Sequence, residues 1–218
     1  MTFFIGLDLG QTQDPSTVAV VEKVQPMAEV VYGMRIEREP VGDPAYHVRH
    51  LERFPLGTTY PAIVDRVKVL LSTPPLAGSA RLVVDQTGVG RAVVDYIRDQ
   101  GLEMTAVTIT AGDSVARDGQ DYRVPKRDLV GVCQVLLQNG RLKLARDMPL
   151  VPVLVKELLD FKVRVTAAAN DVFGTWREGQ HDDLVLALAL AVWYAEYDSG
   201  QGIAFATSYI TRQSNYRG

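Results

Sequence analysis

Blocks of hydrophobic and polar residues follow one another along the chain, and their lengths and periods predict a mixed α/β domain. Three short apolar runs predict strands at Phe3–Gly10, Ser16–Val24 and Ala28–Ile36. Only short links join these runs, whereas parallel pairing needs a crossover of about a dozen or more residues. The three strands are therefore predicted to form an antiparallel meander.

The middle of the chain switches between strand and helix periods. Apolar residues at helical spacing predict helices over 61–71 and 93–97, and apolar runs at 80–85 and 104–109 predict strands. Alternation of this kind implies right-handed crossovers and parallel strands, whose tips are the usual place for chemistry. The segment 110–125 has only weak periodicity and is predicted to be a loop.

The last third of the chain is predicted to add helices, a short strand and a β-hairpin. The expected elements are a helix over Lys126–Leu137, a strand over Arg141–Leu144, a helix over Pro149–Leu159, a hairpin that starts at Phe161–Val165 and turns near Asn170, and a helix over Asp182–Glu196. Beyond these elements the chain is rich in Gly, Ser, Gln and Thr. We therefore expect one domain over residues 1–197 and a flexible tail over 198–218.

Composition bounds the classes of protein that fit. The chain has 218 residues, of which 47% are hydrophobic, enough for one sizeable core. It has no apolar span of 18 residues and no charged-then-apolar leader, so we expect an intracellular chain without a membrane segment. The isolated domain is expected to be a monomer. The single cysteine, Cys133, cannot form an internal disulfide. A net charge of −3 means that any polyanion must be bound by a local basic patch.

Three acidic sites stand at the ends of apolar elements. Asp8 lies within the first apolar run, Asp85 closes the run at 80–85, and the pair Asp182 and Asp183 opens the last helix. A carboxylate inside such a strand costs several kcal/mol to desolvate unless it is paired or binds a cation. Taken singly, each acid also fits a turn or helix-cap role. Together they predict a cage for Mg²⁺ or Mn²⁺, which prefer oxygen ligands.

The order of these elements, with acids on the first strand, the fourth strand and a late helix, resembles the ribonuclease H-like superfamily. Five motifs in order are similar to the nuclease domain of tailed-phage large terminase subunits: Gly6–Gly10, Val84–Gly90, Val124–Asp128, Gly140–Leu142 and His181–Ala189. The resemblance implies a mixed sheet, with the antiparallel meander and parallel strands flanked by helices and with an added β-hairpin.

The resemblance also implies an activity and a set of ligands. The expected activity is metal-dependent endonuclease cleavage of concatemeric viral DNA, with two Mg²⁺ or Mn²⁺ ions acting on the phosphodiester bond. Asp8 and Asp85 would be metal ligands, and the third acidic site would be Asp183 or Asp182, a choice that the sequence leaves open. His181 directly precedes that pair and is a possible accessory residue.

Implied partners are double-stranded DNA, an ATPase motor domain, a portal and a small terminase subunit, all in the cytoplasm of a host cell. Basic residues near the expected site are candidates for binding the DNA backbone. They are Lys126, Arg127, Arg91, Arg123, Lys162, Arg164 and Arg177. Each of these side chains could equally be an ordinary solvent-exposed residue with no role in binding.

Two other functions are compatible with the sequence. Actin-like kinases also open with an acid-bearing strand and a Gly-rich turn, but no second phosphate loop is found here, and the chain contains no G-x-x-x-x-G-K-[ST] motif. A nuclease-fold module that docks onto a packaging motor without cutting is the second alternative. Binding of ATP would favour the first, and absence of metal binding by a folded chain would favour the second.

Overall fold

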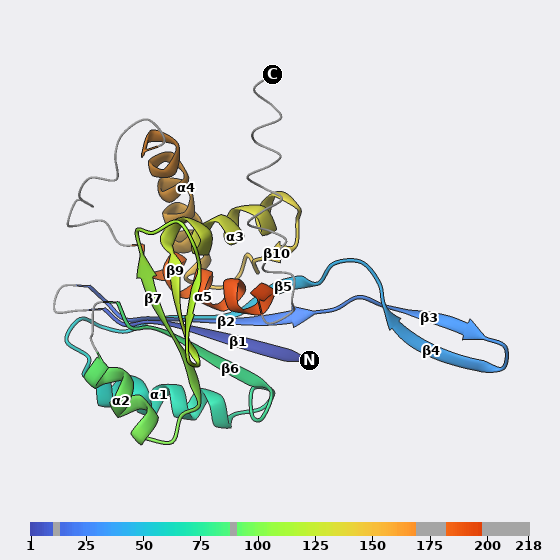
Figure 1. Cartoon of the computed structure of the whole chain (residues 1–218), viewed down its shortest axis with the longest axis horizontal. Helices are drawn as coiled ribbons and strands as arrows, with labels where there is room; N and C mark the ends of the chain where they lie inside the picture. Colours follow the sequence, from blue (N-terminus) through green and yellow to red (C-terminus); the bar gives the residue numbers. More distant parts are fainter. Residues whose placement is uncertain (11–13, 88–90, 169–181, 198–218) are drawn as a thin grey trace.

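The computed structural model describes residues 1–10, 14–87, 91–168 and 182–197, with the backbone alone for 91 and 161–168. An eight-stranded mixed sheet lies between two layers of helices (Figure 1). Its strands are β1 (Thr2–Asp8), β2 (Thr17–Val24), β5 (Ala45–Arg53), β6 (Ala80–Asp85), β7 (Met104–Thr110), β8 (Ala116–Asp118), β9 (Asp121–Pro125) and β10 (Leu142–Lys143). Their spatial order is β10-β5-β2-β1-β6-β7-β9-β8.

One half of the sheet is mainly antiparallel and the other is mainly parallel, as predicted. Strand β1 pairs antiparallel with β2 and parallel with β6, and β6, β7 and β9 run parallel to one another. The third strand of the meander is β5, so the prediction of Ala28–Ile36 for that place is wrong. In β5 the side chains of Tyr46, Val48 and Leu51 are buried, which gives this strand an apolar face for the core.

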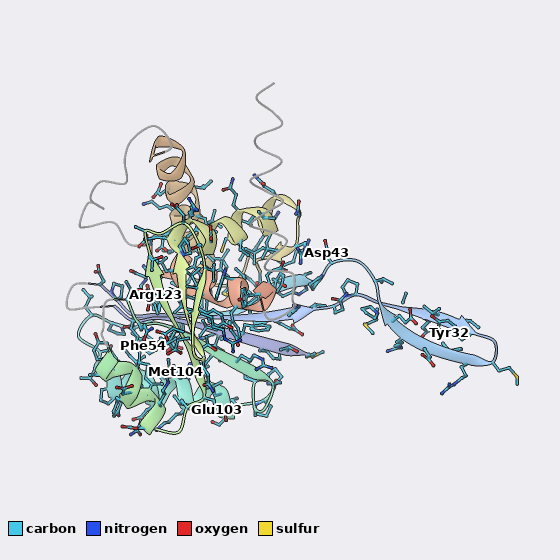
Figure 2. All side chains as sticks on the ribbon, in the orientation of Figure 1. Tyr32, Asp43, Phe54, Glu103, Met104 and Arg123 are labelled. Carbon is cyan, nitrogen blue, oxygen red and sulfur yellow. The ribbon has the colours of Figure 1, made fainter. Side chains whose placement is uncertain are left out.

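Residues predicted for the third strand form a separate two-stranded ribbon instead. Strands β3 (Met27–Tyr32) and β4 (Arg35–Pro40) pair with each other alone and extend away from the body of the molecule (Figure 1). Figure 2 shows Tyr32 far out on this ribbon. Most side chains on both strands are exposed, and the apolar Val30 and Tyr32 of β3 pair with the charged Glu37 and Arg35 of β4. The ribbon therefore has no continuous apolar face with which to enter the core.

In the described part of the chain, five helices cover the sheet, on two sides (Figure 1). Helices α1 (Tyr60–Ser72) and α2 (Arg91–Asp99) pack on one face. Helices α3 (Lys126–Gln138), α4 (Val151–Ala168) and α5 (Asp183–Tyr197) lie on the other. The predicted helices are confirmed, although α4 is longer than expected. Within the described residues, none of these helices has the length and apolar character needed to cross a membrane.

Two local predictions are wrong. The segment Phe161–Val165 continues α4 rather than starting a hairpin, because five alternating residues are too few to separate a strand from a helix. The turn expected near Asn170 lies outside the described residues. The predicted loop over 110–125 contains the hairpin β8–β9, which turns at Gly119 with a φ of +64°. Inward-facing Tyr122 and Val124 give β9 its short alternating pattern.

Helix α5 lies directly against β1. A Cβ atom on Gly6 would fall 1.9 Å from the backbone oxygen of Ala187, so only glycine permits this approach. The hydroxyl of Thr17 donates a hydrogen bond of 2.8 Å to the backbone oxygen of Asp183, which ties the start of α5 to β2. The close approach therefore fixes where the first turn of α5 sits above the strand ends.

Candidate functional site

The three predicted acidic sites meet at one end of the sheet. Asp8 and Asp85 are the last residues of the neighbouring parallel strands β1 and β6, and Asp183 is the first residue of α5. Leu7 and Val84 pair across these strands and lie in the core under α1 and α2. Because side chains alternate along a strand, Asp8 and Asp85 face the α5 side. The exposed fractions of Asp8, Asp85 and Asp183 are only 8%, 8% and 6%.

Asp8 is a buried carboxylate with other negative charges close to it. Burial raises the pKa of Asp8 well above its usual value, and the negative charges of Asp85, Asp183 and Asp182 raise it further. The ammonium of Lys126 lowers it in part. Among the described residues, no hydrogen bond contributes to the pKa of Asp8. A buried carboxylate that is repelled by its neighbours is stabilised most directly by a bound cation.

Asp85 is more firmly held. Burial raises its pKa, and hydrogen bonds from the hydroxyl and the backbone N–H of Thr87 lower it, as does the charge of Lys126. The backbone N–H of Thr87 donates to Oδ1 of Asp85 at 2.7 Å. The Thr87 hydroxyl oxygen in turn accepts a bond of 2.7 Å from the backbone N–H of Ile109 on β7. The orientation of the Asp85 carboxylate is thus fixed from the neighbouring strand.

The acids at the start of α5 have cationic partners. Nζ of Lys126 lies 3.0 Å from Oδ2 of Asp182, and a terminal nitrogen of Arg53 lies 3.8 Å from Oδ2 of Asp183. In the described part of the chain, no three acidic, histidine or cysteine side chains are gathered tightly enough to enclose one ion. Mg²⁺ keeps several waters and is usually held by one or two carboxylates plus substrate phosphate. These carboxylate oxygens therefore suit Mg²⁺ or Mn²⁺, with water and substrate phosphate as the remaining ligands.

Two site residues were missed by the sequence analysis. Arg53 ends β5, and its guanidinium donates a hydrogen bond to the buried carboxylate of Glu157 on α4. Arg53 was hidden because β5 itself was not predicted. Glu157 carries no sequence signal, since it is one of several charged residues in a helix. Only the packing of α4 beside α5 brings Glu157 to the acids.

The predicted DNA-binding residues occupy different surroundings. Lys126 lies among the acids, where it contacts Asp182 rather than an outer surface. Arg127 is more exposed and pairs with Asp113 at 2.8 Å. Arg123 is exposed and pairs with Thr108 of β7. Asp85 pairs with Val107, the residue before Thr108, and side chains of consecutive strand residues point to opposite faces. Arg123 therefore lies on the opposite face of the sheet from the acids.

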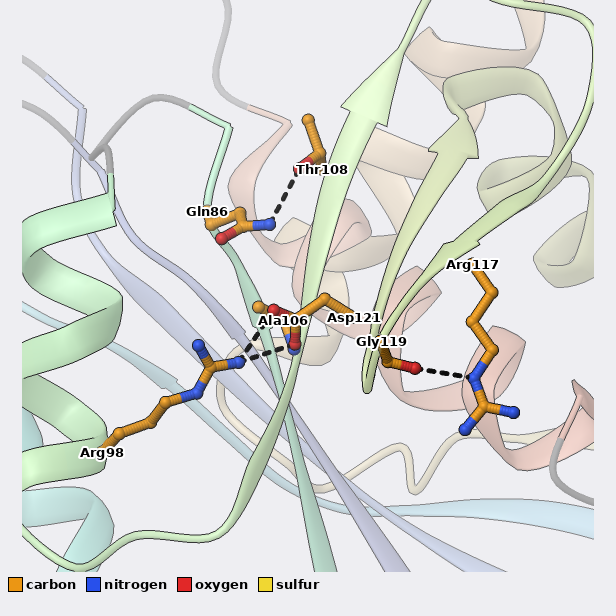
Figure 3. Close-up of polar contacts among 7 residues, drawn as sticks. All are labelled: Gln86, Arg98, Ala106, Thr108, Arg117, Gly119 and Asp121. Carbon is orange, nitrogen blue, oxygen red and sulfur yellow. Dashed lines mark hydrogen bonds and ion pairs between the residues drawn. The ribbon is translucent and has the colours of Figure 1, made fainter.

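On that opposite face, Arg123 lines a polar cavity of about 180 Å³ together with Gln86, Arg98, Thr108, Asp118, Asp121 and Tyr122. Figure 3 shows its main contacts. The side-chain amide of Gln86 donates to the hydroxyl of Thr108 at 2.9 Å. The guanidinium of Arg98 binds both carboxylate oxygens of Asp121 at 2.7 and 2.8 Å. The Arg98–Asp121 pair joins α2 to the outer strand β9.

The remaining candidates are placed only in part. Arg91 is the first residue of α2. Lys162 and Arg164 lie in α4, so their predicted positions on a β-strand are wrong. Arg177 and His181 lie outside the described residues.

A mixed sheet of this order, covered by helices on both faces and with acids at the ends of two adjacent strands and of a crossing helix, is a ribonuclease H-like fold. Structural comparison finds the crystal structure of the large terminase nuclease from thermophilic phage G20c, with a TM-score of 0.53 and 25% sequence identity. The match covers 87% of this chain and 80% of that one. The predicted fold class is confirmed.

Sequence comparison points to the same proteins. The chain is 28% identical, over 149 residues, to the large terminase subunits of Thermus phage G20c and Thermus virus P23-45. The match covers 68% of this chain and 26% of each relative, so the chain spans only about a quarter of their length. No family model matches the chain. These similarities confirm the resemblance to the nuclease domain of large terminase subunits.

Proposed function

We propose that the chain is a metal-dependent DNA endonuclease of a phage packaging terminase. The observation that supports this most is the convergence of Asp8, Asp85 and Asp183 at one end of a ribonuclease H-like sheet. The similarity to the large terminase nuclease of phage G20c supports the same reaction class. The substrate is double-stranded DNA, and cutting of concatemeric viral DNA is the proposed biological step.

In this proposal the acids share the task of holding the metal, and they do so from different elements. Asp8 and Asp85 hold Mg²⁺ or Mn²⁺ from the strand ends, and Asp183 holds it from the helix, with Asp182 as a further ligand. Two bound ions, when present, supply an activated water and neutralise charge on the phosphate. Thr87 keeps the carboxylate of Asp85 in one orientation through its two hydrogen bonds. That orientation is available before any ion arrives, which limits the reorganisation needed on binding.

Lys126 has a second task, because its ammonium lies 3.0 Å from Oδ2 of Asp182. Its ammonium lowers the pKa values of Asp8 and Asp85 and pairs with Asp182. We propose that the Lys126 side chain moves from Asp182 to a DNA phosphate when the substrate binds. Arg127, Arg91, Arg123, Lys162, Arg164 and Arg177 remain candidates for contacts farther along the DNA backbone.

Assembly and location are inferred from the same relatives. An ATPase motor domain, a portal and a small terminase subunit are the proposed partners, and the host cytoplasm is the proposed place of action. Residues 1–197 form the proposed nuclease unit, residues 198–218 a separate tail, and the isolated unit a monomer. His181 is proposed as an accessory to the acid pair that follows it.

The test is cleavage of plasmid DNA with Mn²⁺ or Mg²⁺. Chelation of the metal is expected to stop cutting, and Asp8→Asn, Asp85→Asn or Asp183→Asn is expected to reduce it by at least about 100-fold while the fold remains. Asp65→Asn is the matched control, because this carboxylate is 74% exposed on α1 and away from the site. Normal cutting by all three site variants would refute the proposed function.

A docking module without catalysis is the second candidate. The pairing of Asp182 with Lys126 and the approach of Arg53 to Asp183 favour it, because both acids are partly neutralised without metal. Titration with Mn²⁺ separates the two functions. A folded chain that binds no Mn²⁺ supports docking, and saturable binding supports the nuclease.

A further inference from the structure

An arginine links three elements beside the candidate site. Arg53, at the end of β5, donates a hydrogen bond to Glu157 on α4, and the same terminal nitrogen lies 3.8 Å from Oδ2 of Asp183 on α5. Its side chain is 25% exposed, whereas Glu157 and Asp183 are almost fully buried. The guanidinium thus lies between a buried glutamate and a proposed metal ligand.

Glu157 holds Arg53 in this place. Burial raises the pKa of Glu157, and the hydrogen bond and charge of Arg53 lower it, together with the backbone amides of Val185 and Leu184. Those amides belong to the first turn of α5, the same turn that starts with Asp183. A buried ion pair is strongly destabilised when one partner is removed, so Arg53 is not free to leave Glu157 for solvent.

We propose that Arg53, anchored by Glu157, is a positioning residue that limits how tightly the site binds a divalent cation. This inference rests on the proposed function, because it assumes that Asp183 is a metal ligand. The positive charge of Arg53 this close to Asp183 weakens the attraction of that carboxylate for a divalent metal ion. The site therefore takes its full metal complement less readily than three free aspartates would, which restrains cutting within the fold itself.

Substitution of the two partners has opposite consequences. In Arg53→Gln the competing charge is gone, so the affinity for Mn²⁺ is expected to rise by about tenfold. In Glu157→Gln the arginine keeps its charge but loses its anionic anchor, so Asp183 becomes its main counter-charge. The affinity is then expected to fall, by about threefold or more. A residue that only supports the fold would weaken binding in both variants.

The experiment is calorimetric titration of the whole chain with Mn²⁺, together with thermal denaturation of each variant without metal. Arg49→Gln is the matched control, because Arg49 lies on the same strand and pairs with Glu22 at 2.6 Å, away from the acids. Its affinity for Mn²⁺ is expected to equal that of the unmodified chain. If Arg53→Gln does not fold, the double variant R53Q/E157Q replaces the ion pair with two neutral amides and is also expected to bind more tightly.

The outcomes separate this inference from the proposed function. Tighter binding by R53Q and weaker binding by E157Q support the role of Arg53. If the unmodified chain binds Mn²⁺ and R53Q or the double variant binds it equally or more weakly, the inference fails and the proposed function stands. If the folded, unmodified chain binds no Mn²⁺, both fail.

Discussion

Replacement of Gly6 by alanine tests how the site is assembled. Gly6 lies in the middle of β1, two residues before Asp8, where α5 passes against the strand. The added Cβ atom would lie 1.9 Å from the backbone oxygen of Ala187, and such contacts are essentially never shorter than 3.0 Å. The strand and the helix must therefore separate by about 1.1 Å at this point.

The size of the effect follows from that displacement. Overpacking of a close-packed core costs typically about 1–3 kcal/mol, and the neighbour here is backbone that cannot rotate away. The same movement carries Asp183 away from Asp8 and Asp85, and a misplacement of about 1 Å can lower an enzymatic rate by about 100-fold. We therefore expect Gly6→Ala to lower both the free energy of unfolding and the rate of DNA cleavage.

Chemical denaturation and a plasmid-cleavage assay measure the two quantities. Gly131→Ala is the control, because Gly131 lies within α3 and a Cβ atom there has no neighbour within 4 Å. That change is expected to leave cleavage unaltered and to stabilise the chain by about 0.5–1 kcal/mol, since glycine weakens a helix. A Gly6→Ala variant with the stability and activity of the unmodified chain would show that α5 does not position Asp183 as described.

Two further predictions concern buried charge. The pKa of Asp8 is raised in the folded state, so ionisation of Asp8 destabilises the metal-free fold once the pH rises above the pKa that Asp8 has in the unfolded chain. Asp8→Asn should therefore raise the melting temperature at pH 7 in chelator but not near pH 3. An equal effect at both pH values would contradict this. Arg141→Leu removes the guanidinium that lies 2.6 Å from the buried carboxylate of Glu196, and it should lower the free energy of unfolding by about 3–5 kcal/mol. Arg38→Leu, which breaks an exposed pair with Glu29, should change the free energy of unfolding by less than about 1 kcal/mol. Equal losses in the two variants would refute that account.

The sequence predicted the parts of the fold that depend on local periodicity. Strands β1, β6 and β7 and the helices α1, α3 and α5 lie close to their predicted positions, because each has a strong apolar pattern and a clear end. The position of the third central strand was wrong, since the ribbon at residues 27–40 has as much β-forming sequence as β5. Only the packing of Tyr46 and Val48 against the core decides which segment joins the sheet.

The acids of the candidate site could be predicted because a carboxylate at the end of an apolar run is unusual in itself. Their partners could not. Arg53 and Glu157 are ordinary charged residues in sequence, and their meeting depends on how α4 packs beside β5 and α5. Arg123 shows the converse, because its distance along the chain from the site gives no sign that it faces the other side of the sheet.

The central claim is that Asp8, Asp85 and Asp183 jointly hold divalent cations. Anomalous diffraction from a crystal soaked in Mn²⁺ tests it most directly. We expect Mn²⁺ peaks in contact with carboxylate oxygens of Asp8, Asp85 and Asp183, with the Asp183 carboxylate turned away from Arg53. A well-ordered soaked crystal with no such peaks, and with Asp183 still beside Arg53, would contradict the claim.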